Sequence, residues 1–343
     1  MPVRGRACGS NKAMSIAPHI LVVGGAGYIG SHMVKRLLQA GFTVTVADDL
    51  SSGNAKAVPG AALMVGDIGR AEFINSVLAR AKPAAVMHFA ALIEVAESVR
   101  DPARFYRNNV HASQVLLDAM RAHRIDAFLF SSTAAIFGNP MHVPINESHP
   151  CQPINPYGRS KWIVEQMLGD YALAYGLRAV CLRYFNAAGA HPDGSLGECH
   201  EPESHLIPLV LQVASNRRAQ IAVYGTDYAT PDGSCVRDYV HVVDLCEAHL
   251  LALCRLLEGG GCARYNLGNG VGFSVHQVID TAKRVTGRPI PSRFEPARAG
   301  DCALLVADAT LARRELGWRP KHDSIEQIIR DAWHWEQRYP WWQ

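Results

Sequence analysis

A glycine-rich turn that directly follows a short β-branched run is the feature that most limits what this chain can fold into. The run His-Ile-Leu-Val-Val precedes the segment GGAGYIG at 24–30, and the helical pattern SHMVKRLLQAG follows it. Glycines permit a tight turn and close approach to the backbone, and a helix start offers free N–H groups and a partial positive charge. Strand, turn and helix in this order predict a pyrophosphate site for a dinucleotide, with candidate contacts Gly24, Gly27, Tyr28, Ile29 and Gly30.

Five more short apolar runs alternate with helical patterns through the first half of the chain. They are TVTVADD, AALMVGD, AAVMHFA, AFLFSST and RAVCLRYF. This alternation predicts a doubly wound, Rossmann-type α/β fold: a parallel sheet with helices on both faces and ligand at the carboxyl ends of the strands. After Phe185 the pattern changes to segments rich in Gly, Pro and Asp, with shorter helical stretches. We therefore expect a smaller, irregular α/β lobe for the substrate.

The chain length leaves room for two such units. Its 343 residues are 48% hydrophobic and 19% charged, a globular composition that is typical of a soluble protein. We expect a disordered lead-in at 1–18, with Met14 as an alternative start, and a dinucleotide-binding domain at 19–185. The substrate-binding lobe would cover 186–343, with parts near 236–268 as candidates for a return to the first domain.

Charge and cysteine usage exclude several other classes of function. The net charge is +3 and no run of basic residues could follow a phosphate backbone, so nucleic acid is not an expected partner. No apolar stretch approaches the roughly 20 residues that span a membrane. The nine cysteines are scattered without a C-x-x-C pair, which predicts neither a disulfide framework nor a metal site. A reducing cytoplasm is the expected location.

Polar and apolar residues at the strand ends complete the predicted dinucleotide site. Asp48 ends the second strand 18 residues beyond Gly30, near the roughly 20 expected for the acid that binds the adenosine ribose. Its negative charge would repel a 2′-phosphate, which favours NAD over NADP. The segments at 66–68 and 88–91 could equally serve strand-end packing. The candidate cofactor contacts beyond the turn are Asp48, Asp49, Asp67, Ile68, Phe89, Ala90, Asn109, Ser131 and Tyr184.

A hydroxyl group, a phenol and an amine form the predicted catalytic set. The fifth strand ends in Ser131-Ser132-Thr133, and Tyr157 and Lys161 lie four residues apart at the start of a helical pattern. Residues at this spacing share one helical face. Tyr157 would remove a proton from a sugar hydroxyl, with its pKa lowered by Lys161 and the nicotinamide, and Thr133 would hydrogen-bond the reacting oxygen. Tyr157 and Lys161 would also contact the cofactor.

These motifs resemble the extended short-chain dehydrogenase/reductase family, and from about Ile20 onward the chain resembles the UDP-glucose 4-epimerases within it. Further matching segments are RYFN at 183–186, GAHP at 189–192, the stretch 232–244, YNLG at 265–268 and RAGD at 298–301. The resemblance implies that NAD stays bound while C4 of a UDP-hexose is oxidised to a 4-keto sugar, the sugar rotates, and the hydride returns to the opposite face.

The same resemblance implies the substrate contacts. Diphosphate contacts would come from Asn186, from the segment around His205 and Leu206, and from two arginines, while apolar and aromatic residues would flank the uracil and an acid would meet the uridine ribose. Arginine suits phosphate because its planar fork can bond two oxygens at once. In addition to Thr133 and Tyr157, the implied substrate residues are Asn186, His205, Leu206, Ile221, Val223, Tyr224, Arg237, Arg298, Asp301 and Leu305.

Several positions depart from the family pattern and leave alternatives open. Ile93 stands where many members have Lys, Glu94 beside it is unusual, and Thr133 replaces the commoner Ser. Leu305 stands where some members have a bulky Tyr that closes the sugar pocket. UDP-pentoses, UDP-uronates and UDP-N-acetylhexosamines therefore remain candidate substrates.

Two other functions compete with epimerisation. A nucleotide-sugar 4,6-dehydratase needs an acid and base pair after Thr133, where this chain has Ala134 and Ala135. A non-catalytic NAD-sensing protein could share the fold, but it would gain nothing from a positioned phenol.

A homodimer is a candidate assembly. Four tryptophans lie near the C-terminus. We expect Trp333 and Trp335 to cap the second lobe, and Trp341 and Trp342 are candidates for a contact with a partner.

Overall fold

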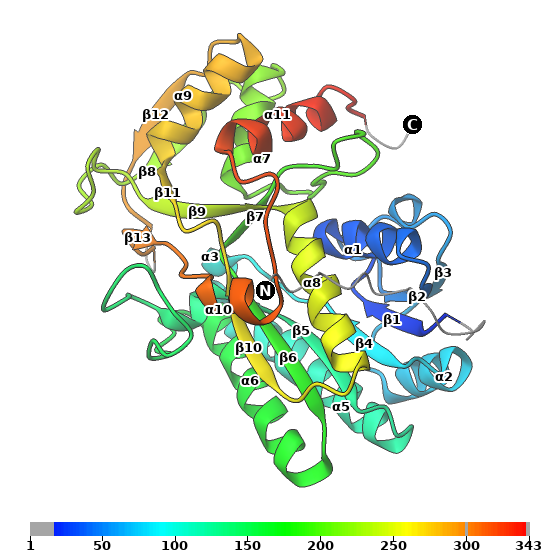
Figure 1. Cartoon of the computed structure of the whole chain (residues 1–343). Helices are drawn as coiled ribbons and strands as arrows, with labels where there is room; N and C mark the ends of the chain where they lie inside the picture. Colours follow the sequence, from blue (N-terminus) through cyan, green and yellow to red (C-terminus); the bar gives the residue numbers. More distant parts are fainter. Residues whose placement is uncertain (1–16, 299–300, 341–343) are drawn as a thin grey trace, which may run out of the picture.

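A seven-stranded parallel sheet organises the molecule, as the alternating runs predict (Figure 1). The computed structural model describes residues 17–298 and 301–340. Each of the six predicted runs forms a strand, and a seventh strand comes from much later in the chain. In sheet order the strands are β10 (Ala263–Leu267), β6 (Arg178–Tyr184), β5 (Ala127–Thr133), β4 (Ala85–His88), β1 (His19–Val23), β2 (Thr43–Asp48) and β3 (Ala62–Val65).

Helices cover both faces of this sheet, which explains why its strands are continuous apolar runs. In β1, Ile20 and Val22 pack into the cluster on one face, and Leu21 and Val23 pack into the cluster on the other. The first face is covered by α1 (Tyr28–Gln39) and α8 (Val242–Leu257). The second face is covered by α2 (Ala71–Ala81), α5 (Ala112–Ala122) and α6 (Pro156–Tyr175).

Short helical segments fill the connections of this layer. They lie after β2, between β4 and α5, and directly after β5, close to the carboxyl ends of the strands. Their bounds are η1 (Ala55–Ala57), α3 (Val95–Arg100), α4 (Pro102–Phe105), η2 (Tyr106–His111) and η3 (Ala134–Phe137).

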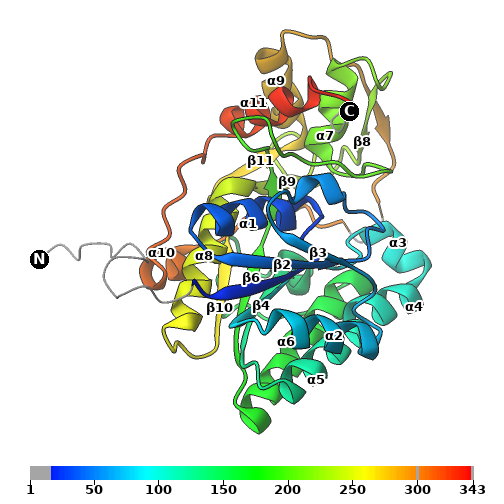
Figure 2. The same cartoon turned by 90° about the vertical axis from the view of Figure 1, so that its right-hand side faces the viewer.

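The second lobe joins short strands to three helices around a core of its own (Figure 2). One sheet has β9 between β11 and β13, with β7 also paired to β9, and a separate pair joins β8 to β12. The strands are β7 (Asn186–Ala188), β8 (Ile221–Tyr224), β9 (Val236–His241), β11 (Gly272–Ser274), β12 (Ser292–Glu295) and β13 (Leu304–Leu305). The helices of this core are α7 (Leu206–Ala214), α9 (Val275–Thr286) and α11 (Ile325–Glu336), and α10 (Thr310–Glu315) packs against the first lobe.

Chain from the second half returns to the first sheet. Strand β10 pairs in parallel with β6, with Leu267 opposite Tyr184, and α8 packs beside α1. The two lobes are therefore joined by several crossings of the chain.

Other findings concern the ends of the chain and its cysteines. Trp335 is buried in α11, where its Nε1 donates to the Glu198 carbonyl at 2.9 Å, and Trp333 packs at the edge of the second core. Trp341, Trp342 and Met14 lie outside the described residues. None of the eight cysteines in the described part of the chain forms a disulfide. Within 17–298 and 301–340, the helices are too short or too polar to cross a membrane.

A buried ion pair fixes α6 to the sheet. Glu165 of α6 accepts hydrogen bonds from Arg183 of β6 at 2.6 to 3.2 Å and from the Ser132 hydroxyl of β5 at 2.6 Å. Both charged side chains are almost fully buried. Removal of one partner would leave the other charge buried without compensation, which is costly.

We predict that Glu165→Ala lowers the free energy of unfolding by about 3 to 5 kcal/mol, because the Arg183 guanidinium is then stranded. The matched control is Asp126→Ala, which breaks the ion pair between Asp126 and Arg178. Because the Asp126 side chain is 58% exposed, this variant should lose less than about 1 kcal/mol of unfolding free energy. Urea denaturation of both variants measures the difference. Equal losses in the two variants would contradict the role given to burial.

Candidate functional site

The glycine turn between β1 and α1 is closely packed, as a phosphate-binding turn must be. Gly24 has a φ of +75°, and a Cβ there would lie 2.3 Å from the backbone nitrogen of Ala90. A Cβ on Gly30 would lie 2.1 Å from the Gly24 carbonyl oxygen. Gly27 differs, since it caps α1 and its Cβ would meet nothing closer than 3.6 Å. The first two glycines are needed by the protein itself, and Gly27 leaves open space in front of the helix.

Asp48 lies beside this turn, at the end of β2. Its carboxylate accepts hydrogen bonds from the backbone N–H groups of Ala26 and Leu50, both at 2.9 Å. Burial raises the pKa of Asp48, and these two hydrogen bonds oppose that effect. The acid therefore holds the turn in shape as well as facing the expected ribose site. Open space at Gly27 and an acceptor at the end of β2 fit NAD.

The other predicted cofactor residues gather at the same edge of the sheet, where β3 to β6 end. Phe89 and Ala90 follow β4 and donate backbone hydrogen bonds to Val23, Asp67 and Ile68 follow β3, and Tyr184 hydrogen-bonds Ser131 across the ends of β6 and β5. Asn109 bridges Leu92 and the Ser160 hydroxyl.

Three of the predicted cofactor residues have side chains that contact other parts of the protein. The Tyr28 hydroxyl donates to the Gly189 carbonyl at 2.6 Å, which ties α1 to the second lobe. Ile29 packs against the first core, and Asp49 accepts from the Ser51 backbone and hydroxyl.

The predicted catalytic residues come together where β5 ends against the start of α6. Pro156 begins the helix, and the side chain of Asn155 caps it by accepting from the Gly158 N–H at 2.8 Å. Thr133 hydrogen-bonds the Tyr157 phenol. The Lys161 amine donates to the Ser131 carbonyl at 2.9 Å and lies over the Phe130 ring.

Burial disfavours the charged form of both groups. It raises the pKa of Tyr157 to about 12; the hydrogen bond with Thr133 lowers this pKa, and the negative charge of Glu94 raises it. Burial also lowers the pKa of Lys161 to about 7. The phenol is thus neutral at pH 7, and it needs an added positive charge nearby before it can act as a base.

The implied substrate residues line up along β7, β8, β9 and β13 of the second lobe. Arg237 of β9 lies opposite Leu305 of β13 in the strand register, and Asn186 of β7 pairs with Tyr239 of β9. The Arg298 guanidinium stacks on the Tyr224 ring with 3.8 Å to its centroid and lies 3.9 Å from the Asp301 carboxylate. His205 and Leu206 lie at the start of α7.

Two of the implied uracil neighbours have side chains in the core of the second lobe. Ile221 and Val223 are buried in the core of the second lobe. Tyr224 and Ala222, on the other face of β8, are only partly buried. The side chain of Tyr224 is therefore available, and Ile221 and Val223 could reach a ligand only through their backbone. The alternation of Ile-Ala-Val-Tyr is a signal of this division, because successive residues of a strand face opposite sides.

Other residues near the site gained no role from sequence. Glu94, which stood out only as a departure from the family pattern, raises the pKa of Tyr157 by its charge. Glu198, His200 and Glu203 surround His205, with 2.6 Å between its Nδ1 and Glu198 Oε1. Their regular spacing, Glu-x-His-x-x-Glu-x-His, is the signal that could have revealed this group.

Comparisons with known proteins agree with this geometry. Residues 20–268 match the model of the NAD dependent epimerase/dehydratase family. A UDP-glucose 4-epimerase of Rhizobium meliloti is 52% identical over 93% of this chain and 97% of its own length. A crystal structure of UDP-glucose 4-epimerase from Brucella ovis in complex with NAD is 48% identical, with a TM-score of 0.90 over 93% of this chain and 99% of that one.

A second similar structure has a bound sugar nucleotide. It is a UDP-glucose 4-epimerase from Stenotrophomonas maltophila with bound NAD and formylated UDP-arabinopyranose. The two proteins share 38% identity, with a TM-score of 0.90 over 94% of this chain and 99% of that chain.

We predict that Gly27→Ala and Gly30→Ala separate cofactor binding from folding. The added methyl at residue 27 meets only open space in the protein but occupies the approach to the pyrophosphate, so bound NAD should fall sharply while the melting temperature of the cofactor-free protein stays near wild type. Gly30→Ala should lower both, because its Cβ would overlap the Gly24 carbonyl. Thermal melts and the NAD released on denaturation measure the two effects, and full NAD retention in Gly27→Ala would refute this assignment.

Proposed function

Because the chain belongs to the NAD dependent epimerase/dehydratase family, we propose that it interconverts UDP-glucose and UDP-galactose by inverting C4 of the sugar. The observation that carries this proposal is the meeting of Thr133 and Tyr157 at the end of β5, with Lys161 one helical turn further along α6. The relatives named UDP-glucose 4-epimerase, at about half identity over nearly the whole chain, support the choice of substrate.

The roles of the three side chains follow from their placement. Tyr157 would accept the proton of the C4 hydroxyl and later return it, and Thr133, already bonded to the phenol, would orient the same oxygen. When bound, oxidised NAD supplies the hydride acceptor and a positive charge that brings the pKa of Tyr157 down from about 12. Lys161, anchored to Ser131, would bind the nicotinamide ribose.

The second lobe would hold the nucleotide and leave the sugar free to turn. Arg237 and Arg298 would pair with the diphosphate, Tyr224 would face the uracil, and Asp301 would meet the uridine ribose. Inversion of C4 requires the 4-keto sugar to present first one face and then the other to the nicotinamide. The protein would therefore bind the nucleotide firmly and the sugar loosely.

Dehydration lacks the groups that it needs. Ala134 and Ala135 follow Thr133 in η3, and neither side chain can transfer a proton. A carboxylate is present at Glu94, but it lies before α3 and its effect on Tyr157 is to raise the pKa of the phenol. Epimerisation requires only one proton-transfer group, and Tyr157 provides it.

A UDP-pentose is the second candidate substrate. The similar enzyme from Stenotrophomonas maltophila holds a formylated UDP-arabinopyranose. In this chain Leu305 lies beside Arg237 at the edge of the substrate lobe, and a leucine closes a sugar pocket less than a tyrosine. UDP-uronates and UDP-N-acetylhexosamines belong in the same panel of substrates.

We predict that the purified protein, without added NAD, converts UDP-galactose to UDP-glucose, and that Tyr157→Phe lowers kcat by about 10²- to 10⁴-fold, as expected for loss of a general acid and base. Product separation after incubation with UDP-galactose, UDP-N-acetylgalactosamine, UDP-xylose and UDP-galacturonate ranks the substrates.

The control is Tyr171→Phe, the same change further along α6, where the hydroxyl donates to the exposed Asp118 carboxylate; this variant should keep wild-type kcat. A non-catalytic NAD sensor would convert none of the four sugars, even with NAD supplied. That outcome, or undiminished turnover in Tyr157→Phe, would end the proposal.

A homodimer is part of the proposal. Leu173 and Tyr175 expose 91% and 54% of their surfaces near the end of α6, and a second copy of the chain would cover this apolar surface. Light scattering of the purified protein tests the assembly, and a monomer at micromolar concentration would contradict it.

We also propose that the protein works in the cytoplasm. Among the described residues the eight cysteines form no disulfide, and four of them are buried, which suits a reducing compartment. Cell fractionation tests this location, and recovery in a secreted or periplasmic fraction would contradict it.

A further inference from the structure

Two glutamates and two histidines of the second lobe converge at the start of α7. The segment 198–205 has the spacing Glu-x-His-x-x-Glu-x-His, and one ligand atom of each of Glu198, His200, Glu203 and His205 lies within 4.8 Å of all the others. Although the cysteine pattern predicts no metal site, imidazole nitrogens and carboxylate oxygens are the ligands that zinc accepts.

The distances between these atoms match the edges of a coordination tetrahedron. Ligands at 2.0 to 2.1 Å from zinc are about 3.3 Å apart. The Nδ1 atom of His205 lies 2.6 Å from Glu198 Oε1 and 3.4 Å from Glu203 Oε1. The Nδ1 atom of His200 lies 3.3 Å from Glu198 Oε1 and 4.0 Å from Glu203 Oε2. One ion at the centre could contact all four side chains after small movements.

The facing ligand atoms of Glu198, His200 and His205 are buried together at short range. Glu198 Oε1, His200 Nδ1 and His205 Nδ1 are buried without a hydrogen-bond partner, in spite of their short separations. Burial of such atoms is costly unless something satisfies them. A cation coordinated by all three would satisfy them together.

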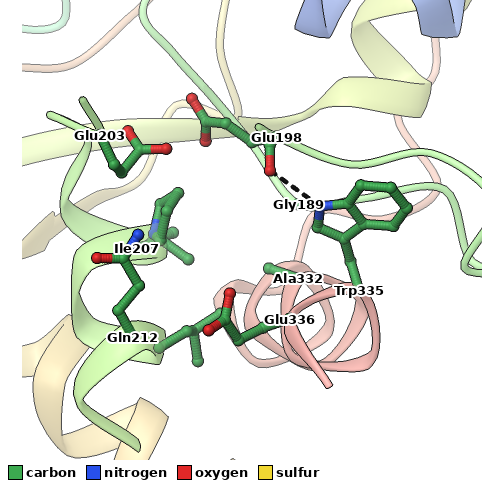
Figure 3. A pocket seen from close by; sticks show the side chains of 10 residues that line it. Gly189, Glu198, Glu203, Ile207, Gln212, Ala332, Trp335 and Glu336 are labelled. Atoms are coloured by element: carbon green, nitrogen blue, oxygen red, sulfur yellow. Dashed lines mark hydrogen bonds between the residues drawn. The ribbon is translucent and has the colours of Figure 1, made fainter. Parts of the chain in front are cut away.

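Neighbouring groups hold the four side chains in place. The Glu203 carboxylate accepts from the backbone N–H groups of Ser204 and His205 at 2.7 and 2.8 Å. Trp335 of α11 donates to the Glu198 carbonyl, and the Tyr28 ring meets the His200 ring edge-on at 6.5 Å. Figure 3 shows Glu198 and Glu203 at one end of the pocket between α7 and α11, opposite Glu336. Such outer contacts are what orient ligands in metal sites.

We propose that Glu198, His200, Glu203 and His205 bind one Zn²⁺ ion that locks the segment 189–205 over the dinucleotide turn. Gly197 and Cys199 of this segment line a hollow together with Ala26, Gly27 and Asn54, and His205 precedes α7. The ion would be structural, since all four positions of a tetrahedral centre come from the protein. It takes no part in the proposed reaction at C4.

The test is the zinc content and zinc affinity of the whole chain, purified without chelator. Wild type should retain about one Zn²⁺ per chain by mass spectrometry of the metal, and, once stripped by a chelator, should bind added Zn²⁺ in preference to Mg²⁺ or Ca²⁺. Loss of an outer contact alone costs such sites 10- to 100-fold in affinity, so loss of a ligand in His200→Ala should weaken Zn²⁺ binding by about 100-fold or more.

The matched control is His111→Ala, which removes an exposed histidine of η2 and should leave zinc binding unchanged. X-ray absorption at the zinc edge of wild type tests the site without any variant, and should show four nitrogen or oxygen neighbours at about 2.0 to 2.2 Å. Stripped wild type that binds Zn²⁺ no better than His200→Ala, or a spectrum with sulfur neighbours, would overturn the proposal and leave the cluster as an ion-pair network of His205 with Glu198.

Discussion

The buried pair of Glu165 and Arg183 is the interaction on which the site depends. Tyr157, Lys161 and Glu165 follow one another at intervals of four along α6, so the same helical face carries the phenol, the amine and the buried acid. Glu165 also accepts from Ser132, the neighbour of Thr133. One carboxylate thus fixes the helix to β5 and β6 and sets where the phenol meets the end of β5.

Burial gives this arrangement its chemical character. The environment that makes the ion pair strong also keeps Tyr157 and Lys161 away from water and disfavours their charges. A site built in this way is a poor base until a positive charge arrives beside it. If Tyr157 transfers the proton as proposed, its basicity depends on the redox state of the nicotinamide, which suits an enzyme that must remove and return the same proton.

The part of the structure that sequence predicts well is the part governed by local pattern. The glycine turn, the six apolar runs and the order of strands and helices all predicted the parallel sheet, because burial on both faces demands continuous apolar strands. The short strands β7, β11 and β13 were not predicted, since two or three residues amid polar segments carry too little periodicity. The pairing of β10 with β6 joins residues some 80 positions apart, and no local pattern encodes such a partner.

In the candidate site, too, local sequence pattern predicted some residues and not those that depend on the three-dimensional fold. Asp48, Thr133, Tyr157 and Lys161 stand at positions that spacing alone singles out, and the structure brings Thr133 and Tyr157 into contact. The influence of Glu94 on Tyr157 depends on how the chain after β4 folds back, which the residue order does not reveal. Ile221 and Val223 were implied as ligand neighbours by resemblance, although the alternation along β8 indicates that their side chains face the core.

Strand β10 follows β6 by about 80 residues in the chain, and this has a consequence during synthesis on the ribosome. When residues up to Phe185 have emerged, β6 is an open edge, and the apolar face that α8 later covers is exposed to water. The nascent chain must keep this surface from pairing with other chains until about 80 more residues have appeared. Because proteins are made at roughly 5 to 20 residues per second, that vulnerable interval lasts several seconds, and it makes the first lobe a natural client for chaperones that shield unfinished sheets.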